Sequence, residues 1–375
     1  MPLFDVYPLY DICPVAASGC WVTDAEGQKY LDLYGGHAVI SIGHGHPDYV
    51  ARIKDQLDRI SFYSNSVLNP LQEELSRELG RQAGLPEHQL FLCNSGAEAN
   101  ENALKLASFH TGKDQVIAFE NSFHGRTSAA VAATDNPKIV APLNAGHKVT
   151  FLPLNQIDKL EAALQSGDVC AVILEGIQGV GGLDMATPEF YTAASRLCRE
   201  YEAVLIADEV QSGFGRSGKF FAFQHSDARP GIISMAKGMG NGFPVGGVLI
   251  APEIVPSHGM LGTTFGGNHL ACAATLGVLE ALEKEKLIEN AARMEAYFRE
   301  RAAALPGIRQ IRGKGLMLGL EFDFEVAALR KRLIFEHRIF TGSAKHKKVL
   351  RILPPLGIGT AEFDLLFEAL QQELG

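Results

Sequence analysis

The chain has 375 residues, of which 46% are hydrophobic and 21% are charged, with 39 glycines and a formal net charge of −9. This apolar content is too high for a disordered protein, and the acidic balance argues against nucleic-acid or anionic-membrane partners, which favour a basic face. Single cores stop growing near about 250–300 residues, so this length favours two packed units. We therefore expect a large enzyme whose excess of glycine marks tight turns and backbone close to ligands.

The cellular compartment can be addressed from the cysteines and from the first residues. The six cysteines are scattered and form no Cys-x-x-Cys pair, so reduced thiols are expected. The first 28 residues contain no Lys or Arg, which is atypical of a signal peptide. No apolar stretch is expected to form the roughly 20-residue helix that spans a membrane. These features predict a cytoplasmic protein.

In chain order, residues 1–47 are too few for a domain and are expected to dock on the remainder. Asn69 and Pro70 predict the start of a helix, because Asn caps and Pro fits the first helical position. Short apolar runs then alternate with helical stretches such as 188–202, a pattern that predicts a mostly parallel α/β sheet covered on both faces. The predicted strands are 116–119, 169–174, 203–207, 232–235 and 247–250.

The pattern changes after about residue 268. A long helical segment, 269–305 with one or two breaks, ends at Pro306-Gly307. It is followed by the stretches 315–322, 325–337 and 349–353 and by a final helix from residue 361. We predict an N-terminal segment at 1–47, a large α/β domain at 48–257 and a smaller α+β C-terminal domain at 258–375.

Two charged residues follow buried strands of the large domain. Lys237 comes after strand 232–235 and before a glycine-rich stretch, where desolvation lowers the pKa of an amine and makes it a nucleophile. Asp208 directly follows strand 203–207 at its carboxyl end and can bind a metal, cap a helix or pair with a cationic ligand atom. Taken alone, such residues are more often a solvated turn lysine and a capping acid.

Two further motifs lie where strands turn into loops or helices. Ser95, Gly96 and Ala97 begin a helix, and their free N–H groups would form a site for phosphate. Phe123 and Arg126 share a loop, which suits ring stacking and carboxylate recognition. Each signal is weak alone, but a phosphate site, an acid, an aromatic ring and a lysine are together the parts that pyridoxal phosphate needs.

At these residues the sequence resembles the class III (ornithine-type) pyridoxal-phosphate aminotransferases, and within them the acetylornithine and succinylornithine group. The resemblance covers nearly the whole chain through motifs at 27–33, 42–47, 94–106, 123–127, 175–182, 208–218, 237–247, 262–268 and 350–355. It implies a transferase of fold type I, with a large cofactor domain, a small C-terminal domain and an active site at the interface of a homodimer.

The resemblance also implies a role for each matching residue. Lys237 would be the Schiff-base lysine, and Asp208 would hold the pyridine nitrogen. The other implied cofactor contacts are Ser95, Gly96 and Ala97 at the phosphate, Phe123 and Val210 on the two faces of the ring, Gln211 at its phenolic oxygen, and Thr264 at the phosphate of the neighbouring subunit. The implied substrate contacts are Arg351 at an α-carboxylate, Arg126 at the acylornithine, and Thr263 where acetylornithine enzymes usually have Ser.

The implied reaction transfers the δ-amino group of an N-acylornithine, foremost N-acetylornithine, to 2-oxoglutarate in arginine biosynthesis. The products are the N-acylglutamate semialdehyde and glutamate. N-succinylornithine, ornithine and other ω-amino acids stay open as substrates. Decarboxylation, racemisation and aminomutase chemistry stay open as reactions on the same scaffold.

One motif departs from the family. The family usually has Glu-Pro-x-Gln-Gly-Glu, whereas this chain has Glu175-Gly-Ile-Gln-Gly-Val180. The resemblance implies that the missing last Glu pairs with the carboxylate-binding arginine. We therefore expect Arg351 to be unmasked or to have another partner, with a changed discrimination between amino donors.

Two rival functions remain at this point, a metal-dependent hydrolase and a non-catalytic ligand-binding protein. The hydrolase would use His44, His46, Asp208 and Glu209. Since no third ligand is assembled beside the two histidines, we expect turn residues there, and at His124, and no metal site.

Overall fold

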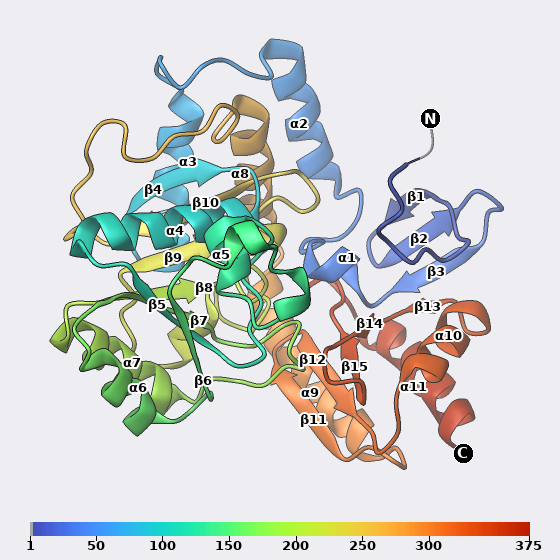
Figure 1. The fold of residues 1–375 in the computed structure, drawn as a ribbon. Coiled ribbons are helices and arrows are strands. Elements are labelled where there is room, and N and C mark those ends of the chain that lie inside the picture. Colours follow the sequence, from blue (N-terminus) through green and yellow to red (C-terminus); the bar gives the residue numbers. More distant parts are fainter. Residues whose placement is uncertain (1–2) are drawn as a thin grey trace.

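A computed structural model describes residues 3–375, which form three β-sheets and the helices around them (Figure 1). The largest sheet consists of β4 (Gln89–Cys93), β5 (Gln115–Phe119), β6 (Val149–Leu152), β7 (Val169–Glu175), β8 (Val204–Asp208), β9 (Ile232–Met235) and β10 (Gly246–Ile250). Their order is β4-β10-β9-β8-β7-β5-β6. The pairs from β9 to β6 are parallel, whereas β10 runs antiparallel to both of its neighbours.

The five strands predicted from sequence are all present, with bounds that differ by at most one residue at either end. Strands β4 and β6, at the two edges of the sheet, were not predicted. Their residues are mostly half-buried, so neither has the continuous apolar run that identifies a central strand such as β7, which is buried throughout.

Helices cover both faces of this sheet (Figure 1). Helix α4 (Gly96–Thr111) packs across β7, β8, β9 and β10 on one face, beside α5 (Ser128–Ala132). Helices α6 (Ile157–Leu164) and α7 (Pro188–Glu200) lie on the other face. Short 3₁₀ helices are found at Pro137–Ile139, Pro142–Asn144, Ala222–His225 and Lys237–Met239.

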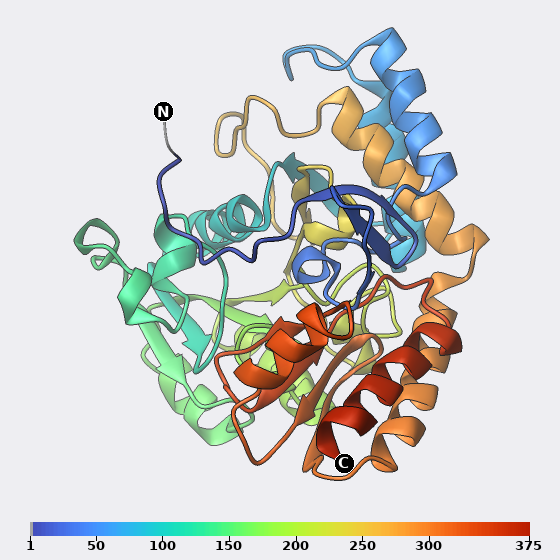
Figure 2. The ribbon, with the colours of Figure 1, turned by 90° about the vertical axis from the view of Figure 1, so that its right-hand side faces the viewer.

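Three helices form a group beside the sheet: α2 (Pro47–Arg59), α3 (Pro70–Ala83) and α8 (His269–Lys284), with α8 packed against the other two (Figure 2). The predicted cap of α3 is confirmed, because the Asn69 side chain accepts a hydrogen bond from the Leu71 amide at 3.1 Å. The predicted long helix is divided into α8 and α9 (Leu287–Ala303) at Lys286, whose φ of +53° ends the first helix.

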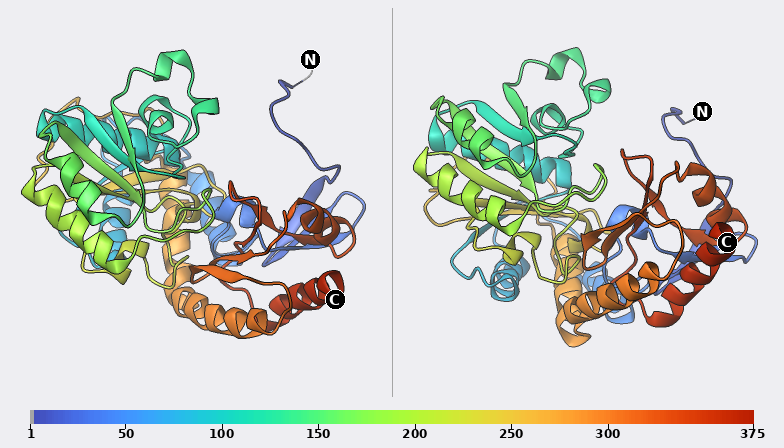
Figure 3. Two further views of the ribbon diagram at one scale, coloured as in Figure 1. Left: turned by 60° about the horizontal axis from the view of Figure 1, so that its bottom comes forward. Right: turned by 90° about the horizontal axis from the view of Figure 1, so that it is seen from below.

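The C-terminal sheet is antiparallel and consists of β11 (Gln310–Lys314), β12 (Met317–Glu321), β14 (Gly342–Ser343) and β15 (Val349–Ile352), in the order β11-β12-β15-β14. Helices α9 and α11 (Thr360–Leu374) lie together below it in Figure 3, joined by contacts of Phe298 with Phe363 and Phe367. Helix α10 (Ala327–Phe335) packs near the strand that follows it.

The third sheet joins the two ends of the chain. Strands β1 (Pro14–Ser18), β2 (Trp21–Asp24) and β3 (Lys29–Asp32) are followed by the short helix α1 (Gly35–Ala38), and β3 pairs in parallel with β13 (Ile339–Phe340). A fully buried arginine, Arg216, adds to this junction by donating to the carbonyls of Ile40, Leu316 and Pro354.

The structure confirms the predicted fold class, a large, mostly parallel α/β sheet with a smaller α+β part at the C-terminus. The boundaries at 47/48 and 257/258 stay a prediction. Packing crosses both, through the pairing of β3 with β13 and the contacts of α8 with α2 and α3. No helix within residues 3–375 has the length and apolar character required to cross a membrane.

Candidate active site

The site lies where the parallel strands of the large sheet end. Glu175 is the last residue of β7 and pairs with Asp208, the last residue of β8, which in turn pairs with Ser234 of β9. A cavity of about 340 Å³ opens at this edge. The position agrees with the rule that ligands of α/β sheets bind beyond the carboxyl ends of the strands.

Most of the residues singled out from sequence line this cavity. They are Ser95, Gly96, Ala97, Phe123, Arg126, Asp208, Val210, Gln211 and Lys237. Three others do not line it: Thr263, Thr264 and Arg351. Thr264 is exposed, whereas the Thr263 hydroxyl accepts a hydrogen bond from the Asn94 side chain at 3.3 Å. Arg351 is buried next to Gly179, which precedes the cavity residue Val180.

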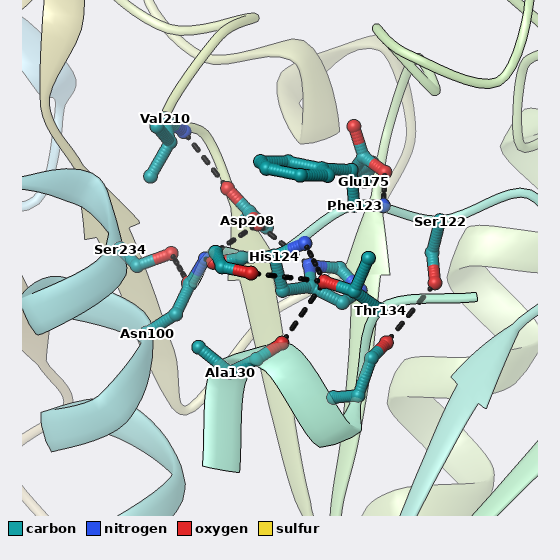
Figure 4. A network of polar contacts seen from close by, with 12 residues as sticks. Asn100, Ser122, Phe123, His124, Ala130, Thr134, Glu175, Asp208, Val210 and Ser234 are labelled. Atoms are coloured by element: carbon teal, nitrogen blue, oxygen red, sulfur yellow. Dashed lines mark hydrogen bonds and ion pairs between the residues drawn. The ribbon is translucent and has the colours of Figure 1, made fainter. Parts of the chain in front are cut away.

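Asp208 lies at the centre of a buried polar network (Figure 4). Its Oδ2 atom accepts from the side chain of Asn100 at 2.7 Å and lies 2.7 Å from Nδ1 of His124, while Oδ1 accepts from the Val210 amide at 3.0 Å. Ser234 in turn donates to Oδ1 of Asn100 at 2.5 Å. The carboxylate is therefore held by several donors, as a buried charge requires.

His124 is not the turn residue that the sequence suggested. Its imidazole is fully buried, and Nδ1 lies 2.7 Å from a carboxylate oxygen of Asp208, an acceptor that favours the tautomer with the proton on Nδ1. Nε2 is buried without a hydrogen-bond partner among the described residues. The histidine thus completes the surroundings of Asp208, a role that its place between Phe123 and Gly125 did not reveal.

Lys237 has an unusual backbone. It follows β9 by two residues and adopts a φ of +48°, a left-handed conformation that non-glycine residues rarely use and that often marks functional sites. Burial lowers the pKa of the Lys237 amine, and the charge of Arg351 adds to this, while Asp208 and Glu175 oppose it. Burial therefore favours the neutral form of the amine over the charged ammonium.

The start of α4 forms a second part of the wall. Ser95 caps the helix by accepting from the Glu98 amide at 3.2 Å, and the first amides of the helix have no partner within it. A Cβ on Gly96 would lie 2.5 Å from Cγ1 of Val210, so glycine is needed for this close approach. The free amides, with the positive end of the helix dipole, suit an anion.

Besides Nε2 of His124, two further polar groups near the cavity lack partners within residues 3–375. Oε1 of Gln211 is buried without a donor, although its Nε2 donates to the His37 carbonyl at 3.2 Å. Nε of Arg351 is buried without an acceptor, although its Nη1 donates to the Gly179 carbonyl at 2.6 Å. Because burying unpaired polar groups is costly, both point to contacts with a bound molecule.

Three residues of the site were not singled out from sequence: Asn100, Ser234 and Glu175. Asn100 had a recognisable signal, since it is a polar residue on the buried face of α4 that carries Ala99 and Ala103. Ser234 interrupts an otherwise apolar strand. Glu175 ends a strand just as Asp208 does, and this parallel was available from the sequence.

The residues of the rival metal site have separate partners. His44 pairs with Asp32 at 2.8 Å, and His46 pairs with Glu285 at 2.7 Å. Glu209 accepts from the Ser212 hydroxyl at 2.6 Å and from two backbone amides. Within residues 3–375 no group of three His, Cys, Asp or Glu side chains is placed to hold a metal ion.

Comparisons with known proteins place the chain in a family. The model of class-III aminotransferases matches residues 6–374. The acetylornithine aminotransferase of Bacillus subtilis (strain 168) is 40% identical over 380 residues, which covers 99% of this chain and 97% of that protein. The enzyme of the same name from Caldanaerobacter subterraneus subsp. tengcongensis is 41% identical over 98% of this chain and 95% of its own length.

Solved structures agree with this placement. The ornithine aminotransferase of Toxoplasma gondii ME49 has a TM-score of 0.91 and 28% identity, covering 98% of this chain and 91% of that one. A second structure of the Toxoplasma gondii enzyme, with a TM-score of 0.90, 28% identity and coverage of 98% and 90%, has partially occupied PLP in its active site. A Bacillus anthracis aminotransferase has a TM-score of 0.90 and 27% identity, covering 99% and 95%.

The network around Asp208 predicts the effect of Asn100→Ala. The substitution removes a donor from a buried carboxylate and leaves the Ser234 hydroxyl without its acceptor, so we expect a loss of about 1–3 kcal/mol in stability, measured by urea unfolding. Asn102→Ala is the matched control: its side chain lies on the same helix, is half-buried and makes one bond to the Glu98 carbonyl. Equal effects of both substitutions would contradict the importance assigned to Asn100.

Proposed function

The chain belongs to the class-III aminotransferases, and we propose that it transfers the δ-amino group of N-acetylornithine to 2-oxoglutarate. The products are N-acetylglutamate semialdehyde and glutamate, a step of arginine biosynthesis. The observation that carries the proposal is the single cavity that contains Lys237, Asp208 and the start of α4. Relatives about 40% identical over nearly their whole length, all acetylornithine aminotransferases, favour the acylated substrate.

Enzymes of this family use pyridoxal phosphate, and the residues of the cavity fit it. The cofactor supplies an aldehyde that attaches to amino groups and a ring that takes up electrons. We assign its phosphate to the amides of Gly96 and Ala97 beside Ser95, and its ring to the space between Phe123 and Val210. The unpartnered Oε1 of Gln211 fits a hydroxyl donor on that ring.

Asp208 and Lys237 would perform the proton chemistry. The Asp208 carboxylate is fixed by Asn100 and His124 on Oδ2, and it would hold a proton on the ring nitrogen of the cofactor. The Lys237 amine, whose pKa is lowered by burial, would remove a proton from the δ-carbon of the donor and would return it to the carbon that carried the cofactor's aldehyde, on the other side of the nitrogen. No other lysine lines the cavity within the described part of the chain.

The two arginines would bind the carboxylates of the substrates, because a guanidinium fork binds a carboxylate in a bidentate manner. Arg126 is exposed at the cavity and would take the carboxylate of the acylornithine. Arg351 would take the α-carboxylate of glutamate through its unpartnered edge. Thr263 lies beside the cavity, because the cavity residue Asn94 donates a hydrogen bond to its hydroxyl. In this position it would contribute to the choice of the acyl group.

A homodimer would complete the site. Thr264 is exposed outside its own cavity, and Phe265 beside it is 59% exposed and packs on the 39% exposed Phe62. Further exposed apolar residues lie close by in sequence, at Tyr63 and Leu68. An apolar surface of this kind is typical of an interface, and on a second copy Thr264 would reach the neighbouring phosphate.

We also infer a cytoplasmic setting without nucleic-acid or membrane partners. All six cysteines are unpaired, and five of them are buried, which suits a reducing compartment. The net charge of −9 disfavours binding to other polyanions.

A panel of amino donors tests the substrate. With 2-oxoglutarate as acceptor, kcat/KM for N-acetylornithine should exceed that for ornithine by at least about tenfold, because the acyl group removes the charge of the α-amine. N-succinylornithine is the third member of the panel. A preference for ornithine or for N-succinylornithine would overturn the assignment of the acetyl substrate while leaving the aminotransferase itself in place.

Lys237→Ala tests the lysine. The purified wild-type protein should be yellow and lose its colour with borohydride, which fixes the cofactor covalently to Lys237 and is detected by mass spectrometry of that peptide. The variant should bind the cofactor without this linkage and lose turnover by at least about 10²–10⁴-fold. Lys219→Ala, at an exposed lysine of the same region, is the control and should behave as wild type. Near-normal turnover of Lys237→Ala would refute the assigned role.

Val180→Glu tests the departure from the family motif. A carboxylate next to Gly179 would pair with Arg351 and compete with the α-carboxylate of glutamate. We expect the ratio of kcat/KM for glutamate to that for N-acetylornithine to fall several-fold, measured in the two half-reactions by cofactor absorbance. Val180→Gln has the same shape without the charge and should change the ratio less. An unchanged ratio in Val180→Glu would contradict the idea.

A further inference from the structure

Glu175 is a buried acid of the active-site cavity to which the proposed reaction gives no task. It ends β7 beside Asp208, is 7% exposed and lines the cavity. Within residues 3–375 its hydrogen-bond donors are two backbone amides and no basic side chain. Burial raises the pKa of its carboxyl to about 7. Burying a carboxyl group without a basic partner lowers the stability of the fold, so the contacts of Glu175 need an explanation.

The two oxygens of Glu175 bind two different loops. Oε1 accepts from the Phe123 amide at 2.9 Å, in the loop after β5. Oε2 accepts from the Gly179 amide at 3.0 Å, in the loop after β7. One carboxylate thereby fixes the backbone of the proposed stacking residue relative to the backbone of the neighbouring loop. Figure 4 shows the first of these bonds beside the Phe123 ring.

The second loop holds Arg351. The Gly179 carbonyl accepts from Nη1 of Arg351 at 2.6 Å, and this is the one hydrogen bond that the described residues provide for the guanidinium. Val180 offers no carboxylate to it. Since both the amide and the carbonyl of Gly179 are engaged, the Glu175 carboxylate and the arginine are linked through a single residue.

We propose that Glu175 is a positioning residue that fixes Arg351 and Phe123 relative to each other through the backbone of Gly179. The inference rests on the proposed role of Arg351 in carboxylate binding. In this chain the backbone of Gly179 replaces the glutamate side chain that the family usually has at position 180. The neutral Gly179 carbonyl orients the Arg351 guanidinium and leaves the positive charge of the guanidinium available to the substrate. Both oxygens of Glu175 must be acceptors, because both of their partners are amide donors.

Glu175→Gln is the sharpest test, because glutamine keeps the shape but turns an NH₂ group toward one of the two amides. In the cofactor-loaded enzyme we expect faster hydrogen–deuterium exchange at Phe123 and Gly179. We also expect the dissociation constant of glutarate, a dicarboxylate probe, to rise by about tenfold in calorimetry. The near-ultraviolet circular dichroism of the cofactor should change as the Phe123 ring shifts.

Glu209→Gln is the matched control. Glu209 is also buried, accepts from the amides of Ala222 and Phe223, and has a pKa raised to about 7 by burial. Its substitution should lower the thermal midpoint as Glu175→Gln does, but it should leave glutarate binding unchanged. This separates positioning from a general loss of stability.

Arg351→Ala supplies the coupling measurement. If Glu175 acts through the arginine, Glu175→Gln should weaken glutarate binding no further in the Arg351→Ala background. Should Glu175→Gln not fold, Glu175→Asp carries the test: it keeps two acceptor oxygens but draws them back, so the same effects should follow at smaller size.

Unchanged exchange at both amides, or glutarate binding within twofold of wild type, would overturn the proposal. Full additivity with Arg351→Ala would overturn it too. These readouts do not depend on which amine is the donor, so a failed substrate panel leaves this test valid. Conversely, a wild-type enzyme that turns over N-acetylornithine while Glu175→Gln has no effect would refute only the positioning role.

Discussion

The carboxylate of Asp208 is 4% exposed, and an ionised carboxylate loses several kcal/mol of hydration when it is buried without compensation. The neighbouring residues are arranged to supply that compensation. Asn100 and His124 bind one oxygen and the Val210 amide binds the other, while Ser234 fixes the orientation of Asn100. The contributing segments are α4, the loop after β5, β8 and β9, so the position of this one charge constrains four parts of the fold.

The second constraint is steric and concerns how closely the backbone approaches the cavity. A side chain at Gly96 would collide with Val210, and one at Gly246 would lie 2.7 Å from the Ser95 carbonyl. Lys237 is the opposite case, because it is a residue with a long side chain whose φ of +48° lies in the left-handed region that favours glycine. With this backbone conformation Lys237 lines the cavity instead of lying in a solvated turn.

Much of the active site could be predicted from the sequence, because local sequence patterns identify the strands and the residues that follow them. The strands that precede Asp208 and Lys237 are short, buried and almost entirely apolar, and parallel strands bring their carboxyl ends to one edge of the sheet. Edge strands β4 and β6 lack that signal. The network residues Asn100 and His124 were missed because their role depends on a partner more than 80 positions away, which no local pattern records.

The surroundings of Arg351 are compatible with the proposed carboxylate site even though Val180 offers no acidic partner. An acidic partner would cancel the charge of the guanidinium and would have to move away whenever an anionic substrate arrives. A peptide carbonyl orients the same group by its dipole and leaves the full positive charge in place. The overall charge of −9 disfavours polyanionic partners, whereas under the proposed function the buried cations Lys237 and Arg351 would attract small dicarboxylates locally. Under the proposed function, recognition would depend on the few charges at and behind the cavity wall and on how rigidly the backbone holds them.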